Sequence, residues 1–537
     1  MLTQVIAECQ KPNIILIIAD DMGWNDIGFH GSNEIPTPNI DALAYHGAIL
    51  SRHYTQSVCT PSRASLMTGK YPIRMGLQGR AFFNDVRVSL PLNETLLPQY
   101  LKKQGYSTAL VGKWHLGYYK NTTTPNKRGY DSFFGYYGGW VRYNDSKNTM
   151  TQSGVPAFDA RRNFERAGAE FSGKYNTDVF TDEAIRIISS HDQSKPLFLE
   201  LAYTAVHAIF GNTLQVRNLE ENNKRFAYIE DPQRRLFAGV LSAMDESVGK
   251  VIESLDKHGL LANSVVLFMS DNGGQTIKGH SELTNYGSNW PLRGIKGSLL
   301  EGAVHCAATI WSPLLQQNVV LSNLMHLSDW LPTLNYIAGG DEIGNIDGIN
   351  SWDYLAGVET KSPRNGVLLN IDEKKKSAAV ISGNWKLVRL ASADYNLSGH
   401  YGYSGRKVRK YDMAGVLSSP THRALSKYDK KKLIEDDFWR SRNAALIDSK
   451  CKAGLNKTYR NAIDGPLPCF SNSSCLFNLK DDACEFTDLS GKHPNKVKEL
   501  NGIIEVYEKE LVKQWSGNPD PEADPRNHGG YITPWVR

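Results

Sequence analysis

Residues 13–21, "NIILIIADD", form a continuous apolar run that stops abruptly in two aspartates. An apolar run without alternation predicts a strand that is buried on both faces. Strands of this kind belong to parallel sheets, whose two faces are covered by helices. This segment therefore predicts an α/β architecture for the part of the chain that contains it.

The alternation of strand and helix continues along the chain. Helices are predicted over residues 96–104, 181–191 and 236–255, and strands over 107–113, 195–207 and 264–272. The helix at 236–255 carries an apolar residue at about every fourth position, which gives it one apolar face. The sequence thus predicts a large, mixed and mostly parallel sheet between two layers of helices.

The pattern of predicted elements changes after about residue 375. "SAAVISGNWKLVRL" predicts antiparallel strands around a turn at Gly383, and Val497, Leu500, Ile504 and Leu511 form the apolar stripe of a closing helix. A chain of 537 residues is long enough for two domains. We therefore expect an α/β domain over residues 1–375 and a smaller α+β domain over residues 376–537.

The charge pattern argues against a nucleic-acid partner. The net charge is only +5, and the lysine clusters in "DEKKKSAA" and "YDKKKLIEDD" have acidic neighbours. No apolar stretch approaches the roughly 18 residues that a transmembrane helix needs, so no transmembrane segment is expected.

Glycosylation sequons and cysteines indicate an oxidising compartment. The Asn-x-Ser/Thr sequons begin at Asn93, Asn121, Asn144, Asn396, Asn456 and Asn472. The first residues, "MLTQVIAECQKPN", lack the basic start and long apolar run of a signal peptide. The simplest expectation is a mature secreted or lumenal protein whose signal peptide has been removed.

The seven cysteines are Cys9, Cys59, Cys306, Cys451, Cys469, Cys475 and Cys484. Cys475 and Cys484 are close enough in sequence for a local bridge, and Cys451 and Cys469 bracket another loop. Cys9 and Cys306 would then pair or stay free, although a sequence alone does not give the connectivity.

Polar side chains gather at the ends of the predicted strands. Asp20 and Asp21 follow the first strand, and Asp271 and Asn272 follow the strand at 264–272. In an open α/β sheet, ligands bind beyond the carboxyl ends of the strands. Each pair by itself is typical of a turn or a helix cap. Together they form a set of hard oxygen donors that suits Ca²⁺ or Mg²⁺ rather than zinc.

Cationic and proton-transfer groups are expected at the same edge. Lys113, His115 and His207 lie at or after strand ends, and Arg63 and Lys296 add positive charge. Such a set suits a tetrahedral oxyanion such as sulfate or phosphate. A single histidine in a loop would usually have no role in catalysis, but both histidines here follow strands that point to one edge.

Cys59 opens the segment "CTPSRASLMTG", which predicts a helix with Pro61 in its first turn and Gly69 at its end. A helix N-terminus favours an anion, so an ordinary cysteine here would be a candidate thiolate nucleophile. A soft thiolate is nevertheless a poor match for a hard-cation site built from carboxylates. An oxygen-based group is expected at this position.

The same segment resembles the signature Cys-x-Pro-Ser-Arg-x-x-x-Leu-x-Thr-Gly of the formylglycine-dependent sulfatase family. The likeness extends through "ADDMGWNDIGFHGS", "TPNIDALA", "GKWHLG", "DNGGQT", "NWPLRGIKGSLLEG", "HLSDWLPTL" and "LFNLKDDACEFTDLS", and is closest to the arylsulfatase B type. It implies an alkaline-phosphatase-like fold and the hydrolysis of sulfate esters. It also implies that a formylglycine-generating enzyme converts Cys59 to formylglycine, whose hydrate is the nucleophile.

The resemblance also implies individual roles. Asp20, Asp21, Asp271, Asn272 and the modified residue 59 would bind Ca²⁺, with Mg²⁺ the less favoured ion. Arg63 would balance the charge of the hydrate, and Lys113 would contact both the hydrate and the sulfate. His115 would bind the second hydroxyl and later take its proton. His207 and Lys296 would bind the ester and assist departure of the alcohol from a covalent sulfo-enzyme.

Three departures from the family pattern lie near the expected leaving-group side. "AIF" follows His207, "EGAVHCAAT" replaces the usual Glu-Gly-Gly-Val-Arg, and Ile295 and Gly297 flank Lys296. They leave the substrate open among aryl, sugar and small-metabolite sulfates such as glucosinolates. The alternatives are a phosphate-ester or phosphonate hydrolase of the same superfold, and a binding protein with a vestigial site. The resemblance further implies a secreted or lysosomal protein.

Overall fold

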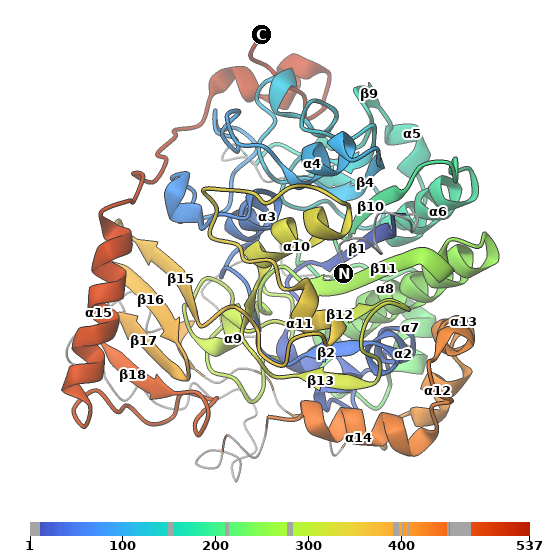
Figure 1. Ribbon diagram of the computed structural model, residues 1–537. Coiled ribbons are helices and arrows are strands. Elements are labelled where there is room, and N and C mark those ends of the chain that lie inside the picture. Colours follow the sequence, from blue (N-terminus) through green and yellow to red (C-terminus); the bar gives the residue numbers. More distant parts are fainter. Residues whose placement is uncertain are drawn as a thin grey trace.

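The computed structural model describes residues 11–148, 154–209, 214–276, 283–389, 397–399, 402, 404–405, 408–447, 451 and 474–537. A ten-stranded sheet runs through the molecule in the order β13-β2-β12-β11-β1-β10-β4-β5-β8-β9 (Figure 1). Its strands are β1 (Asn13–Ala19), β2 (Ala48–Leu50), β4 (Ser107–Lys113), β5 (Ser132–Tyr136), β8 (Arg161–Arg162), β9 (Glu165–Arg166), β10 (Leu197–Ala202), β11 (Ser264–Ser270), β12 (Ala308–Trp311) and β13 (Val319–Leu321).

The central strands of this sheet are parallel. β1 pairs in parallel with β10 on one side and with β11 on the other, and β10, β4 and β5 continue the parallel run. Antiparallel pairs occur toward both edges, between β11, β12 and β2 and between β5, β8 and β9. The predicted mixed and mostly parallel sheet is therefore confirmed. Every residue of β1 is buried, as its unbroken apolar sequence predicts.

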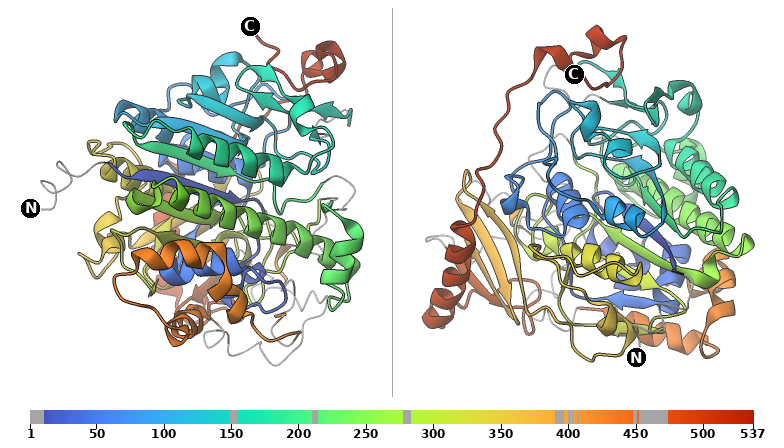
Figure 2. Two further views of the ribbon diagram at one scale, coloured as in Figure 1. Left: turned by 90° about the vertical axis from the view of Figure 1, so that its right-hand side faces the viewer. Right: turned by 45° about the horizontal axis from the view of Figure 1, so that its top comes forward.

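Helices cover both faces of the large sheet. One face packs against α2 (Pro38–His46), α6 (Asn176–Ser189), α8 (Pro232–Lys257) and α13 (Pro420–Leu425). The other packs against α3 (Cys59–Thr68), α4 (Leu97–Lys103), α10 (Trp330–Ile337) and α11 (Trp352–Ala356). The left view of Figure 2 looks onto the first layer, with the long green helix α8 across it. Further helices of this part are α5 (Gly168–Phe171), α7 (Leu219–Arg225), α9 (Glu301–Val304), α12 (Met413–Ser418) and α14 (Glu435–Ala445).

A second, antiparallel sheet lies beside the first. Its strands are β15 (Gly366–Asp372), β16 (Ser377–Ser382), β17 (Trp385–Arg389) and β18 (Cys475–Asn478) in sequential order, and α15 (Pro494–Glu508) packs on it (Figure 1). The small two-stranded pairs are β3 (His53–Tyr54) with β14 (Met325–His326) and β6 (Lys147–Asn148) with β7 (Ala157–Phe158). The predicted smaller α+β unit is thus present.

Two features cross the predicted domain boundary at residue 375. β15 precedes the boundary but pairs along its length with β16, which follows it. α12, α13 and α14 follow the boundary but contribute side chains to the core of the large sheet. The sequence indicated that the pattern of elements changes near this position. Strand pairing between distant residues decided which segments join each core.

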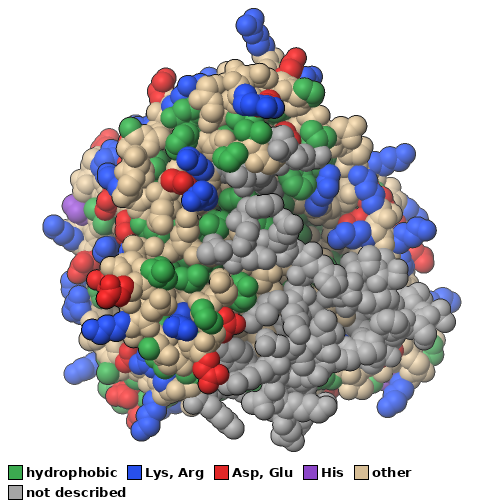
Figure 3. Space-filling model, turned by 180° about the vertical axis from the view of Figure 1, so that it is seen from behind, with side chains coloured by type: hydrophobic (Ala, Val, Ile, Leu, Met, Phe, Trp, Pro, Cys, Tyr) green, Lys and Arg blue, Asp and Glu red, His purple; other side chains and the backbone are tan. Residues whose placement is uncertain are grey.

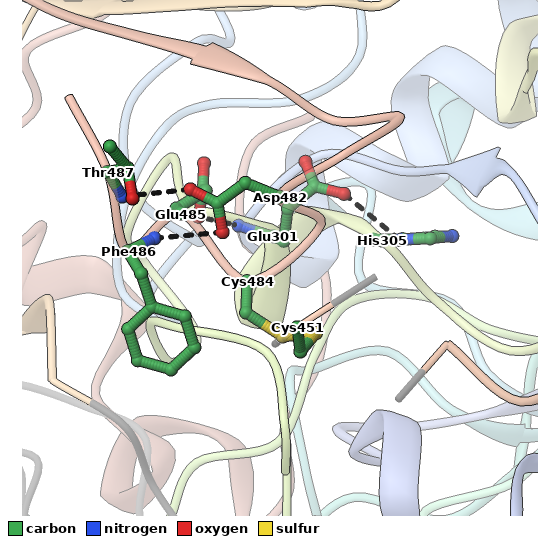
Figure 4. Close-up of a disulfide and its surroundings, with 8 residues drawn as sticks. All are labelled: Glu301, His305, Cys451, Asp482, Cys484, Glu485, Phe486 and Thr487. Atoms are coloured by element: carbon green, nitrogen blue, oxygen red, sulfur yellow. Dashed lines mark hydrogen bonds and ion pairs between the residues drawn. A yellow bond between two sulfur atoms is a disulfide. The ribbon is translucent and has the colours of Figure 1, made fainter. Parts of the chain in front are cut away.

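A buried ion cluster links the four-stranded sheet to α9 and β3. Lys386 of β17 extends its Nζ to 2.8 Å from Glu301 Oε1 and 2.8 Å from Glu485 Oε1. The hydroxyl of Tyr54 lies 2.8 Å from Glu301 Oε2. The Nδ1 of His305 lies 3.0 Å from the same oxygen (Figure 4). Charges that are buried this deeply need partners, since breaking such a pair destabilises a protein by about 3–5 kcal/mol.

The cysteine pairing differs from the expected one. Cys451 forms a disulfide with Cys484, close to the ion cluster (Figure 4). The suggested Cys475–Cys484 and Cys451–Cys469 bridges are therefore wrong, and Cys475 is bonded to another cysteine. The folded chain, and not proximity in sequence, brings Cys451 to 5.4 Å from Cys484 between Cα atoms. Cys9 and Cys469 lie outside the described residues, and Cys306 is a buried free thiol.

None of the described helices is both long enough and apolar enough to cross a membrane. On the face shown in Figure 3, lysine and arginine side chains are interspersed with aspartate and glutamate among the coloured residues. The described surface on this side therefore mixes the two signs of charge.

Glu200 makes the stability of the fold depend on pH. It lies in β10, is 4% exposed, and accepts a hydrogen bond from the Tyr130 hydroxyl. Burial raises the pKa of Glu200 from 4.5 to about 7. A raised folded pKa means that proton binding stabilises the fold below the unfolded pKa, and that this stabilisation is lost as the pH rises toward the folded pKa.

We therefore expect Glu200→Gln to gain stability relative to wild type as the pH rises from about 4.5 to about 7.5, by on the order of 3 kcal/mol. Denaturant unfolding of both proteins at the two pH values measures the change. Glu165→Gln, at an exposed residue of β9, is the control and should show no pH-dependent difference. An equal difference for Glu200→Gln at both pH values would contradict the expectation.

Candidate active site

The carboxyl ends of the central parallel strands meet at one edge and carry the expected polar residues. Asp20 and Asp21 follow β1, Lys113 ends β4, and Asp271 follows β11. All ten of the predicted site residues come together there through the contacts described below. Nine are at most 4% exposed, and Lys296 is 15% exposed.

His207 reaches this edge by a different route from the expected one. The predicted strand extends to His207, but β10 ends at Ala202. The segment beyond it runs beside Asp20, whose N–H donates to Ala205 O and whose carbonyl accepts from Val206 N, both at 2.9 Å. These main-chain bonds place His207 next to the aspartates.

Asp21 is the most densely contacted carboxylate of the site. Its Oδ1 accepts a hydrogen bond of 2.7 Å from Asn272 Nδ2, and Lys296 Nζ lies 2.6 Å from Oδ1 and 2.8 Å from Oδ2. Burial acts to raise the pKa of Asp21, but Lys296, His207 and Asn272 outweigh it and lower the pKa to about 2. Asp21 is therefore a permanent anion.

Asp271 pairs with the arginine of the signature segment. Arg63 donates to Asp271 Oδ2 from Nη2 at 2.9 Å and from Nε at 3.2 Å. Oδ1 of the same carboxylate accepts from the N–H of Asp21 at 3.3 Å. The Arg63 guanidinium is held at the edge of the site by this fork and by a 3.4 Å contact to Lys113 O.

Within the part of the chain that the structure describes, Oδ1 of Asp20 and Oδ1 of Asn272 are buried in the site without a hydrogen-bond partner. The other oxygen of Asp20 accepts from Lys113 Nζ at 2.6 Å. Burial, together with Asp271 and Asp21, raises the pKa of Asp20 to about 7 against the opposing effect of Lys113. Ligand atoms of Asp20, Asp21 and His207 lie within 4.8 Å of one another. Unpaired buried oxygens beside like charges are what a hard cation would satisfy.

Cys59 is the first residue of α3, and its Sγ lies 3.3 Å from His115 Nδ1. The helix ends at Thr68, and Gly69 adopts a left-handed conformation with φ 68°, as the predicted stop requires. Burial raises the pKa of the Cys59 thiol, although Lys113 and Lys296 oppose it. An unmodified cysteine here would be protonated and a poor nucleophile, contrary to the expectation of a low-pKa thiolate.

His115 is held in one tautomer by a main-chain carbonyl. Its Nε2 lies 3.1 Å from Phe82 O, which can only accept a hydrogen bond. Nε2 therefore carries the proton, and the lone pair of Nδ1 faces residue 59. Burial and the neighbouring Lys113 hold the pKa of His115 well below its usual value, so the ring is neutral.

His207 and Lys296 form the opposite wall of the site. His207 Nδ1 donates to Ala208 O at 2.5 Å, which leaves Nε2 as an acceptor 3.3 Å from Lys296 Nζ. Burial lowers the pKa of His207 to about 3. Asp21 raises the pKa of Lys296 above its usual value against the effect of burial, so Lys296 remains an ammonium ion.

The sequence did not reveal the residues that support this site. Asn285 Nδ2 donates to Asp21 O at 2.8 Å and to Val206 O at 3.2 Å. Asn289 bonds both N and O of Gly274, whose carbonyl also accepts from Lys296 N. Phe82 acts through its main-chain carbonyl. Asn289 lies within the quoted "NWPLRGIKGSLLEG" motif, but its type gave no hint of its role, and Phe82 gave no signal at all.

The backbone is constrained at two of these positions. Asp21 and His115 have φ of 62° and 55°, in the left-handed region that non-glycine residues seldom adopt. Such conformations cost about 1–3 kcal/mol each and persist where the surroundings hold them, often at functional sites.

Comparison with known proteins relates this chain to one family. The sequence pattern of the sulfatase family matches residues 12–340. The chain is 34% identical over 538 residues to arylsulfatase J of Mus musculus, covering 99% of this chain and 81% of that protein. It is 33% identical over 322 residues to mouse N-acetylgalactosamine-6-sulfatase, covering 57% of this chain and 58% of that protein.

Solved structures share the architecture. The crystal structure of Ps i-CgsB in complex with k-i-k-neocarrahexaose has a TM-score of 0.71, with 25% identity over 97% of this chain and 98% of that one. The PsFucS1 sulfatase from Pseudoalteromonas sp. has a TM-score of 0.66 at 22% identity, over 96% and 94% of the two chains.

Proposed function

Because the chain belongs to the sulfatase family and is a sulfuric ester hydrolase, we propose that it works with formylglycine at position 59 beside a Ca²⁺ ion. The observation that carries the proposal is the placement of Cys59, a buried and protonated thiol at a helix N-terminus, against an anion-binding and cation-binding edge. The thiol suits neither role, and an oxygen group suits both.

The residues present fit a hard divalent cation. Asp20 and Asn272 each leave a buried oxygen without a partner, and Asp21 and Asp271 add negative charge. Carboxylate and amide oxygens are ligands that Ca²⁺ prefers. These four residues and the modified residue 59 would hold the ion, which would lower the pKa of a bound hydroxyl and neutralise charge.

The hydrate of formylglycine would supply an oxygen that attacks sulfur and a second hydroxyl that later loses its proton. Three cationic side chains of the protein lie around residue 59. Arg63, Lys113 and Lys296 face it from α3, β4 and the loop before α9. Fixed positive charges in a buried site stabilise the charge that develops on sulfate oxygens in the transition state.

The two histidines have separate tasks. Neutral His115 presents the lone pair of Nδ1 to residue 59 and takes a proton there, while Phe82 O keeps Nε2–H in place. On the other wall, Lys296 stays protonated and donates toward the ester, and His207 Nε2 orients its ammonium group. A cationic donor near the leaving oxygen assists departure of the alcohol.

Among the three substrate classes left open, we propose sulfated carbohydrate. N-acetylgalactosamine-6-sulfatase is a relative, and Ps i-CgsB was crystallised with k-i-k-neocarrahexaose. Among the described residues, a Cβ at Gly297, on the proposed leaving-group side, would meet Leu397 alone within 4 Å, at 3.7 Å. Room beside Lys296 suits a bulky alcohol.

We also propose that the protein passes through the secretory pathway, to be secreted or lysosomal and glycosylated. The sequon residues Asn93, Asn121 and Asn144 are exposed. Asn396, Asn456 and Asn472 lie outside the described residues. The Cys451–Cys484 disulfide and the disulfide bond of Cys475 agree with an oxidising compartment.

The mass of the peptide containing residue 59 tests the proposal most directly. Protein secreted from a eukaryotic host should show the formylglycine mass, and the same sample should hydrolyse members of a panel of aryl, sugar and glucosinolate sulfates. An active sample with an unmodified thiol would overturn the formylglycine mechanism. A modified sample without activity on any sulfate ester would overturn the proposed function.

A further inference from the structure

The chain beyond α15 forms a C-terminal strap, residues 511–537, that leaves the small sheet and runs back over the large one (Figure 1). Main-chain bonds tie it to the segment after α3, from Val512 N to Ile73 O, from Trp515 N to Gly76 O and from Asp520 N to Asp85 O, at 2.9, 3.0 and 2.7 Å. The mechanism above uses no residue of the strap.

Trp515 of the strap packs against Phe82, which belongs to the segment after α3. Its ring meets that of Phe82 edge-on, with ring centroids 5.4 Å apart and an angle of 79°. The Arg80 guanidinium lies 5.7 Å from the Trp515 ring and 5.1 Å from the Phe83 ring. Phe82 is 3% exposed, so Trp515 covers a side chain that would otherwise face solvent or a void.

The main chain of Phe82 is bonded to the active site on both sides. Its carbonyl accepts from His115 Nε2 at 3.1 Å, and its N–H donates to Thr60 Oγ1 at 3.2 Å. The Thr60 hydroxyl in turn donates to His115 O at 3.3 Å, and Thr60 directly follows Cys59 in α3. A shift of Phe82 would therefore move the imidazole relative to residue 59.

We propose that Trp515 is a positioning residue that holds Phe82 so that its carbonyl keeps His115 Nδ1 aimed at residue 59. The inference rests on the proposed function, because it assigns Trp515 to the step in which His115 takes a proton. In this proposal Trp515 acts on the reaction only through its contact with Phe82.

The step that depends on His115 is the release of sulfate. The O–H bond of the free hydroxyl at residue 59 breaks and its proton goes to Nδ1, while a C=O bond forms. The C–O bond to the sulfate breaks, and sulfate leaves with the electron pair; water then adds to the aldehyde and restores the hydrate. Release of the alcohol comes earlier and does not use this proton transfer.

Loss of Trp515 should therefore slow the second half of the reaction alone. We expect Trp515→Ala to lower kcat by about 10- to 100-fold, since small misplacements of a catalytic group have effects of this size. With an aryl sulfate in rapid mixing, the first equivalent of alcohol should appear at the wild-type rate as a burst. The peptide containing residue 59 should retain sulfate during turnover, which mass spectrometry of the quenched enzyme detects.

Two further variants make the test specific. Trp515→Phe retains an aromatic ring against Phe82 and should restore kcat to within a few-fold of wild type. Tyr531→Ala removes another aromatic of the strap, one that packs on Phe158 and Arg166, and should leave turnover and retained sulfate unchanged. If Trp515→Ala does not fold, Trp515→Leu replaces it with the same expected outcomes.

The proposal would be overturned if Trp515→Ala slowed the burst and the steady state equally. It would also be overturned if this variant had a lower melting temperature but retained no sulfate on the peptide containing residue 59. A wild type that is inactive with formylglycine in place would instead overturn the proposed function, so the two failures are distinguishable.

Discussion

Replacing Cys59 with serine should leave a protein that releases one equivalent of alcohol per active site and then stops. A serine hydroxyl can take the place of one oxygen of the hydrate and attack sulfur, but it has no second hydroxyl to expel the sulfate. Turnover should fall by at least about 10³-fold, a loss typical of removing a group that forms the covalent bond. Rapid quench with an aryl sulfate measures the single equivalent, and mass spectrometry locates the sulfate at position 59.

Cys306→Ser is the matched control, because Cys306 is the other buried free cysteine among the described residues. Its thiol lies 3.2 Å from Thr55 Oγ1 and outside the catalytic set, so turnover should persist. Repeated turnover by Cys59→Ser would show that no second hydroxyl is needed, and the formylglycine mechanism would have to be abandoned.

Asp20→Asn should strongly weaken the response of the protein to calcium. Asp20 supplies a buried oxygen without a partner and a negative charge beside Asp21 and Asp271. Loss of one ligand charge should weaken calcium binding by at least about 100-fold. Wild type, stripped with a chelator, should regain both activity and stability on addition of calcium, with roughly 3–4 kcal/mol of stabilisation at 100 to 1,000 times the Kd.

For Asp20→Asn, the melting temperature should no longer rise at the calcium concentrations that stabilise wild type, and activity should return only at much higher calcium concentrations. Asp192→Asn, at an exposed residue before β10, controls for the loss of one charge and should respond as wild type does. A wild-type melting temperature that is indifferent to chelator and calcium would remove the cation from the proposed site. Restoration by Mg²⁺ but not by Ca²⁺ would change the identity of the ion.

The strand ends were predictable because burial and chain direction are both visible in sequence. "NIILIIADD" is apolar at every position before Asp20, and β1 is buried at every position. β4 and β11 follow the predicted ranges closely, and β10 ends earlier than predicted. Parallel strands deliver whatever follows their carboxyl ends to one edge, so the convergence of Asp20, Lys113 and Asp271 follows from strand order alone.

The supporting residues and the disulfide were not predictable in this way. Phe82 acts through a main-chain carbonyl, which every residue type possesses, so no side-chain pattern identifies it. Trp515 lies 433 positions after Phe82 in the sequence, and only the folded chain brings the two rings together. The Cys451–Cys484 bridge likewise depends on where two loops meet.

By itself, the sequence determined the α/β fold class, the edge of the sheet at which the candidate site residues meet, and the unusual setting of Cys59. Each of these depends on local pattern, namely apolar periodicity, the residue type after a strand, and the spacing of a signature. The tertiary structure alone decided which nitrogen of His115 faces residue 59, how Asp21 and Lys296 set each other's charge, and that β15 joins the second sheet. These features depend on distances and hydrogen bonds between segments far apart in the chain, which are set only when the chain is folded.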